Sequence, residues 1–216
     1  MVTAPGLTLL HTSPVHVPVF DALRDRHHPG AVLRHLVVPE LLDRARADGP
    51  RSVAPALREL LGAAGPGPVL VTCSTIGATA EALAPALGAP VLRVDRPMAA
   101  AAVRTGPCTG PRIAVLAAVA STLAPTVELL AEEAGGRAVS VVTHLVPGAW
   151  ESFEAGDTAG YLSQVAEAAD AVTGADVIVL AQVSMAGAAT LATTATPVLS
   201  SPASGLAAAL ALTAEA

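Results

Sequence analysis

A cysteine followed at once by two small hydroxyl residues is the part of this sequence best suited to chemistry. Residues 69–72 form an apolar run typical of a buried strand, and an alanine-rich helical pattern starts at Ser74. Cys73 is therefore predicted at a helix N-terminus, where free backbone N–H groups and the helix dipole favour a thiolate. Ser74 and Thr75, with their amides, would offer hydrogen bonds to a carboxylate. The alternative is a buried structural cysteine, the commoner fate of a free thiol.

The composition argues against several classes of binding partner and excludes two kinds of active site. The 216 residues carry a net charge of −6 and 2% aromatic residues, which argues against binding to nucleic acid. All 12 basic residues are arginines, and without lysine a pyridoxal Schiff base and a P-loop phosphate site are excluded. No apolar run reaches the roughly 20 residues of a membrane span, and the first residues lack the basic region of a secretory signal. We expect a cytoplasmic protein with no membrane and no nucleic-acid partner.

Apolar strands alternate with helical patterns along the chain. In the first half, strands are expected at residues 7–10, 32–38, 69–72 and 90–94, and helices at 15–26, 40–47, 52–64 and from 74 onward. Residues 176–215 read as a buried strand, an alanine-rich helix, a strand and a helix. Strands separated by helices predict right-handed crossovers and a parallel sheet, with functional groups at the carboxyl ends of the strands. The predicted fold class is therefore α/β.

The second half repeats the first at a nearly constant offset. His35 and His144 occupy similar segments 109 residues apart, and the same shift carries Cys73 onto Gln182. It also carries the turn at residues 11–13 onto residues 120–122. We expect an internal duplication of two pseudo-symmetric halves, residues 1–107 and 108–202, with a C-terminal helix at 203–216 that would complete the first. The breaker-rich connector holds Cys108, which we interpret as a bystander.

Two such halves would bring the turns after their central strands onto a shared cleft between them, where α/β folds bind ligands. The turns follow residues 10, 72, 116 and 181. We therefore expect the active site in this cleft.

These motifs resemble the aspartate/glutamate/hydantoin racemase superfamily. The resemblance covers essentially the whole chain and rests on Val-Thr-Cys73-Ser-Thr and on the apolar strand that begins at Asp176. It implies two pseudo-symmetric domains, no cofactor, and one cysteine from each half flanking the carbon next to a carboxylate. The implied substrate is a small amino or dicarboxylic acid, and a homo-oligomer is compatible with the family. The polar positions that match its carboxylate-binding residues are Thr12, Ser13, Ser74, Thr75, Ser121 and Thr122.

The sequence departs from the family at the second cysteine. Gln182 stands there, and neither its amide nor the nearby Ser184 replaces a thiolate as a base. Ser184 is instead a candidate for binding substrate. A single Cys73 is compatible with proton exchange on one face of the substrate, with decarboxylation, or with a maleate-type cis–trans isomerisation. Decarboxylases that resemble this family keep the second-half cysteine, whereas this chain keeps the first-half one, Cys73. A non-catalytic protein that binds a small anion is the remaining alternative.

The histidines do not have metal-binding spacing. His11 and His16 are five residues apart rather than four, and no carboxylate accompanies them, so no metal site is expected. His35 and His144 each precede a Leu-Val segment, which favours a structural role kept from the ancestral half. His144, close in sequence to Trp150 and Phe153, is also a candidate for binding substrate.

Overall fold

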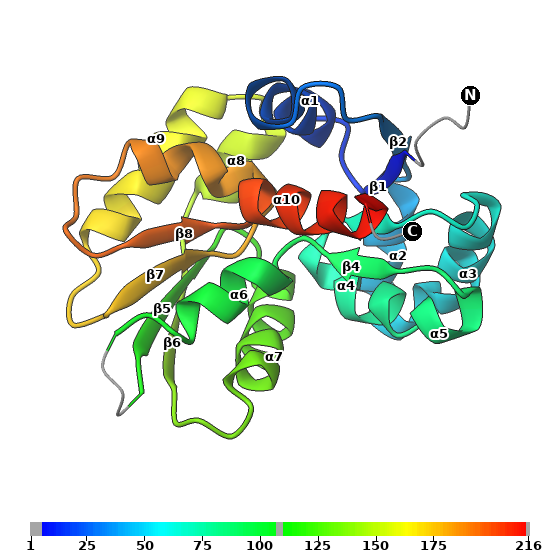
Figure 1. The fold of residues 1–216 in the computed structure, drawn as a ribbon. Coiled ribbons are helices and arrows are strands. Elements are labelled where there is room, and N and C mark those ends of the chain that lie inside the picture. The colour runs from blue at the N-terminus through cyan, green and yellow to red at the C-terminus, as the bar shows by residue number, and fades with distance from the viewer. Residues whose placement is uncertain (1–5, 107–109, 215–216) are drawn as a thin grey trace. The chain divides into compact units, whose positions relative to one another are not determined.

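The protein, seen in a computed structural model that describes residues 6–106 and 110–214, forms two compact α/β units (Figure 1). Unit 1 runs to Val94 and resumes at Pro202, and unit 2 runs from Asp95 to Ser201. The division falls ahead of the predicted connector because the helix that follows Asp95 packs against a helix and a strand of unit 2. Cys108, expected in the connector, lies outside the described residues.

Unit 1 contains a parallel sheet of four strands in the order β2-β1-β3-β4. The expected alternation of strands and helices is confirmed here, with ends that differ by one or two residues. The elements are β1 (Leu7–His11), α1 (His16–His27), β2 (Leu33–Val37), α2 (Glu40–Asp48), the 3-10 helix η1 (Pro50–Val53), α3 (Ala54–Ala63), β3 (Val69–Val71), α4 (Ser74–Glu81), α5 (Ala84–Leu87), β4 (Val91–Arg93) and α10 (Ser201–Ala214).

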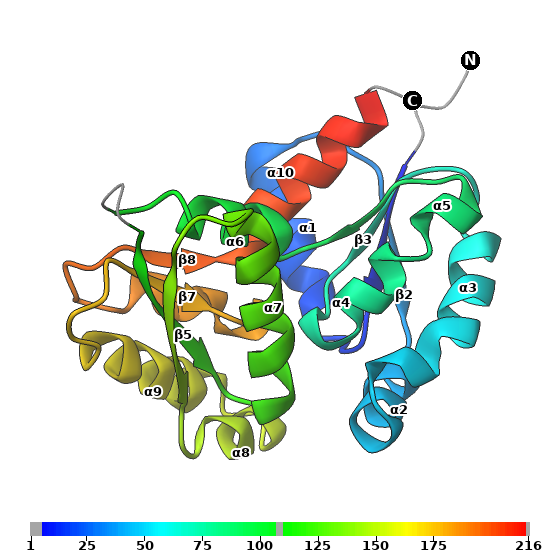
Figure 2. The same ribbon diagram turned by 90° about the horizontal axis from the view of Figure 1, so that it is seen from below.

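Unit 2 repeats this architecture with the strand order β6-β5-β7-β8, again all parallel (Figure 2). The alanine-rich helix expected after β7 is present, and it is a 3-10 helix. The elements are α6 (Arg96–Ala102), β5 (Arg112–Ala117), the 3-10 helix η2 (Ala120–Thr122), α7 (Leu123–Ala134), β6 (Ser140–Leu145), α8 (Ala149–Glu154), α9 (Thr158–Asp170), β7 (Val177–Leu180), the 3-10 helix η3 (Val183–Thr190) and β8 (Val198–Ser200).

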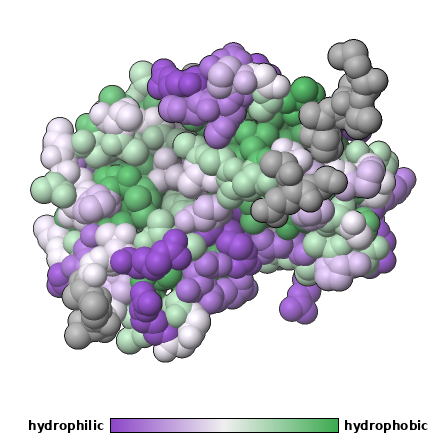
Figure 3. Space-filling view, in the orientation of Figure 1, coloured by the Kyte–Doolittle hydropathy of each residue, from purple (hydrophilic) through white to green (hydrophobic). Residues whose placement is uncertain are grey.

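The side chains of each central strand alternate between two cores. In unit 1, Leu10 and Val71 belong to a buried cluster with Leu57 of α3 and Ile76 of α4. On the opposite face of β1, the ring of His11 lies 5.6 Å from that of Phe20 in α1. Hydrophilic residues gather on the outer surface of α1 (Figure 3). Helices therefore cover both faces of the sheet, as a parallel sheet requires.

Both sheets have a topological switch point between their two central strands. The connection after β1 leads to β2 on one side, whereas β3 leads to β4 on the other. The same holds for β5 and β7 in unit 2. Open α/β sheets bind ligands at the carboxyl ends of the strands at such a point. We therefore expect a ligand site at the turns after β1 and β3 in unit 1, and at the turns after β5 and β7 in unit 2.

The hydrogen bonds of the sheets define which residues of the two units are equivalent. The amide of Thr72 donates to Leu10 O, and the amide of Ala181 donates to Leu116 O, both at 3.0 Å. Leu10 and Leu116 are thus equivalent, an offset of 106 rather than 109. The predicted match of residues 11–13 with 120–122 is therefore wrong. The physical reason is that the paired residues of the two central strands are 62 residues apart in unit 1, from Leu10 to Thr72, and 65 apart in unit 2, from Leu116 to Ala181. Ser121 and Thr122 therefore lie in η2, beyond the strand-end turn.

The two similar histidines are also not equivalent. Leu9 pairs with His35, whereas its counterpart Val115 pairs with Thr143, and His144 pairs with Leu116. A shift of one residue in a strand turns a side chain to the other face of the sheet. His35 and His144 therefore lie on opposite faces of their sheets, and they do not share an inherited structural position.

Within the parts of the chain that the structure describes, no helix has both the length and the apolar character needed to cross a membrane.

Candidate active site

Cys73 lies at the carboxyl end of β3 and is the N-cap residue of α4. Its extended backbone (φ −111°, ψ 114°) ends the strand and starts the helix, and its side chain makes no capping hydrogen bond. Ser74 and Thr75 form the first turn of α4, and all three side chains are buried. The thiol thus lies where a helix N-terminus stabilises an anion.

Thr12 and Ser13 lie at the neighbouring strand end. Because β1 and β3 pair up to Leu10 and Val71, the residues that follow both strands emerge at the same edge of the sheet. Thr12 is buried and Ser13 is half-buried. The structure therefore groups Thr12 and Ser13 with Cys73, Ser74 and Thr75 around the switch point of unit 1.

A chain of hydrogen-bonded side chains lies directly behind this turn. His11 Nδ1 is 2.8 Å from Thr72 Oγ1, and His11 Nε2 is 2.8 Å from His35 Nδ1. The chain continues from His35 Nε2 to Asp21 Oδ1 at 3.4 Å, and Asp21 forms an ion pair with Arg24 at 2.7 Å. Thr72, the residue between β3 and Cys73, is thus connected through His11 of β1 and His35 of β2 to Asp21 on α1.

The two histidines closest to the turn are neutral at physiological pH. The pKa of His11 is lowered to about 3, first by burial and then by charge repulsion from the neighbouring His16 and His35. Burial also lowers the pKa of His16 to about 4. His16 is the first residue of α1, and its buried Nδ1 makes no hydrogen bond.

The carboxylate of Asp21 determines the direction of the hydrogen bonds. Because Asp21 only accepts, His35 Nε2 carries the proton between them. When His35 is neutral, its Nδ1 accepts from His11, and His11 Nδ1 then accepts the Thr72 hydroxyl proton. Thr72 Oγ1 also lies 3.1 Å from Leu10 O, a second acceptor for the same proton.

Sequence reasoning did not identify Thr72, His35 and Asp21 as partners of His11. They lie 61, 24 and 10 residues from it along the chain, so no local spacing could reveal the contacts. The available signal was the position of His11 directly after an apolar strand, where parallel sheets expose functional groups.

In unit 2, the Gln182 side chain is hydrogen-bonded to the backbone of the turn after β5. Gln182 is the N-cap residue of η3, the position equivalent to Cys73. Its Oε1 accepts hydrogen bonds from the amides of Ala118 at 2.7 Å and Val119 at 3.2 Å. The glutamine therefore holds the ends of β5 and β7 together by its own amide group.

The other predicted polar residues of unit 2 differ in their surroundings. Ser184 Oγ lies 2.8 Å from the hydroxyl of Tyr161, whose pKa burial raises to about 12. Thr122 is buried in η2, and its carbonyl accepts from Thr126 Oγ1 at 2.8 Å. The buried Oγ of Ser121 has no hydrogen-bond partner. The hydroxyl of Ser121 is therefore a buried group whose hydrogen-bonding capacity is unused.

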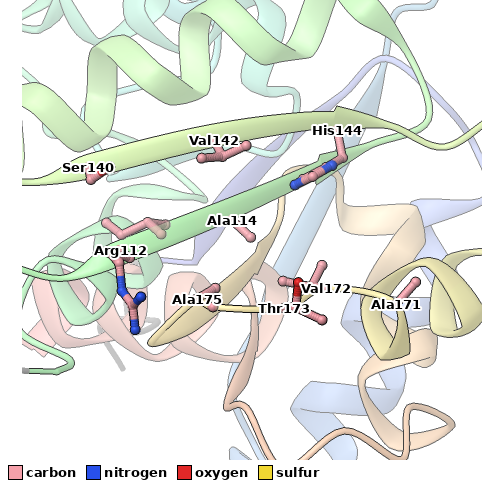
Figure 4. Close-up of a pocket in the computed structure, with 11 residues that line it drawn as sticks. Arg112, Ala114, Ser140, Val142, His144, Ala171, Val172, Thr173 and Ala175 are labelled. Atoms are coloured by element: carbon pink, nitrogen blue, oxygen red, sulfur yellow. The ribbon is translucent and has the colours of Figure 1, made fainter.

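His144 is exposed on β6, and a groove of about 210 Å³ runs beside it. Figure 4 shows Val142 and His144 on β6 opposite the loop that carries Thr173. Among the described residues, no group of three or more His, Cys, Asp or Glu side chains is arranged to hold a metal ion.

The chain matches a known protein family over most of its length. The model of the family described as Asp/Glu/Hydantoin racemase matches residues 17–209. The chain belongs to this family. The resemblance deduced from the Cys73 motif is thereby confirmed, and so is the expectation of an enzyme of the Asp/Glu racemase superfamily. A comparison with curated proteins gave no match.

Solved structures have the same two-unit α/β fold as this racemase-family chain. A glutamate racemase from Bacillus anthracis is 18% identical with a TM-score of 0.71, over 98% of this chain and 82% of that one. An aspartate racemase from Picrophilus torridus is 14% identical with a TM-score of 0.70, over 97% and 94%. The Gly74Cys mutant of arylmalonate decarboxylase is 18% identical with a TM-score of 0.59, over 97% and 94%. At these identities the likeness concerns the fold alone.

Proposed function

We propose that this racemase-family enzyme moves a proton at the carbon next to the carboxylate of a small acid, with Cys73 as its thiol base. The observation that supports the proposal best is the position of Cys73 at the N-terminus of α4, beside Thr12 at the switch point of unit 1. The amides and hydroxyls of residues 12–13 and 74–75 would bind the substrate carboxylate. The chemistry needs no cofactor, because the thiolate removes and returns the proton itself.

The absence of a thiol at Gln182 favours a reaction with one base. An amide has no usable proton equilibrium, and its oxygen already accepts two backbone hydrogen bonds. Cys73 would therefore exchange the substrate proton on one face, and a decarboxylation that ends in protonation by Cys73 is the second candidate. We further propose a cytoplasmic location, consistent with a chain of only two cysteines, and assembly into a homo-oligomer.

The test is incubation with a panel of small amino and dicarboxylic acids in deuterated water. Mass spectrometry, chiral chromatography and carbon dioxide release would follow exchange, inversion and decarboxylation together. We expect exchange without inversion, and Cys73→Ser should lower it by about a hundredfold or more. Cys108→Ser is the matched control and should retain activity. The proposal would be refuted if no acid of the panel reacts, or if Cys73→Ser keeps full activity. The absence of any reaction would favour a protein that only binds anions.

A further inference from the structure

Two backbone N–H groups converge on one side-chain oxygen in the turn after β5. Ala118 and Val119 donate to Gln182 Oε1 at 2.7 and 3.2 Å. A pair of adjacent amides aimed at one point is an arrangement that binds carboxylate oxygens and other anions. The side-chain oxygen of glutamine is the neutral counterpart of such a carboxylate oxygen.

The corresponding turn in unit 1 lacks this side chain. Because Leu10 is equivalent to Leu116, Thr12 and Ser13 correspond to Ala118 and Val119. The position of Gln182 is taken by Cys73, whose side chain is shorter and makes no capping hydrogen bond. The glutamine thus distinguishes the two otherwise similar turns.

Two further features of unit 2 suit a polar ligand in the turn after β5. The Oγ of Ser121, two residues beyond Val119, is buried without a hydrogen-bond partner. The turn also lines a cavity of about 280 Å³ with Trp150 and Glu151. Glu151 is exposed, so its repulsion of an anion is weakened by physiological salt.

We propose that the amides of Ala118 and Val119 form a carboxylate site that Gln182 closes with its own side chain, leaving the turn of Thr12 and Ser13 as the open carboxylate site. The open site rests on the proposed function, whereas the closed site stands on the geometry of unit 2 alone.

The test uses acetate as the probe and the full-length chain. Backbone amide chemical shifts of Ala118 and Val119 would be followed by NMR during titration of the parent, Gln182→Ala and Gln182→Glu. Removal of the side chain in Gln182→Ala should open the site, so its two amide signals should shift saturably, with an apparent Kd at least about tenfold lower than in the parent. In Gln182→Glu the carboxylate is supplied by the chain itself, and these signals should not respond.

The outcomes separate the closed site from the catalytic proposal. If a folded Gln182→Ala shows no saturable response at Ala118 and Val119, or if the parent responds equally, the closed site is refuted. Shifts confined to Thr12 and Ser13 would refute it as well while supporting the open site. None of these readouts needs turnover, so they are unaffected if Cys73 proves inactive.

Discussion

Two buried histidines should make the stability of unit 1 depend on pH. The pKa values of His11 and His16 are lowered to about 3 and 4, whereas in the unfolded chain each is near 6.5. Below pH 6.5 the unfolded state therefore binds more protons than the folded state, so the free energy of unfolding falls as the pH falls. We expect a loss of roughly 1 kcal/mol per pH unit for each histidine between about pH 6 and 4.

The variant His16→Phe tests this dependence on one residue. Its Nδ1 has no hydrogen-bond partner, so the substitution should cost little at pH 7.5 while the slope of stability against pH becomes shallower. Urea denaturation at pH 7.5, 6.5 and 5.5 measures both quantities. His27→Gln, at the exposed end of the same helix, is the control and should keep the parental slope. An unchanged slope in His16→Phe would show that His16 is not buried as a neutral group.

At the scale of elements, close packing of α4 against β4 determines how Cys73 is held. A Cβ added at Gly77 would lie 3.0 Å from Arg93 Cβ and 3.2 Å from Arg93 Nε. We expect Gly77→Ala to destabilise the protein by about 1–2 kcal/mol and to change the rate of alkylation of Cys73, because either α4 or the buried Arg93 must shift to make room. Gly62→Ala in α3 is the matched control. Its Cβ would meet only Leu87 at 3.9 Å, so the helix should gain roughly 0.5–1 kcal/mol. Equal effects of the two substitutions on thermal denaturation would contradict this interpretation.

The elements also show what could be read from the sequence. Apolar runs such as residues 69–71 and 177–180 are buried strands because hydrophobic periodicity is a local signal. The position of Cys73 at a helix N-terminus follows from the same signal and is correct. The match of residues 11–13 with 120–122 failed because the segment between the two central strands is three residues longer in unit 2, a difference that the pattern of polar residues does not reveal. The contacts of His11 and of Gln182 are long-range, so only the folded sheets reveal them.

At the scale of the whole molecule, the two units carry different residues at equivalent positions, Cys73 after β3 and Gln182 after β7. The equivalence of Cys73 and Gln182 predicts that a thiol at residue 182 would serve as the missing second base. We expect Gln182→Cys to create or raise racemisation of an acid that the parent only exchanges with solvent, on the order of a hundredfold. Chiral chromatography measures inversion, and Cys73→Ser in the same background should abolish it.

Gln182→Ser is the control that isolates the thiol. Both substitutions remove the oxygen that accepts from Ala118 and Val119, so both open the same two amides. Only Gln182→Cys adds a group that can be a thiolate near neutral pH, since a serine hydroxyl is far less acidic. Racemisation raised equally by both variants would mean that the freed amides, not the thiol, limit the reaction. A parent that already racemises at the rate of Gln182→Cys would show that another group serves the second face, and Ser184 and His144 would be the first residues to substitute.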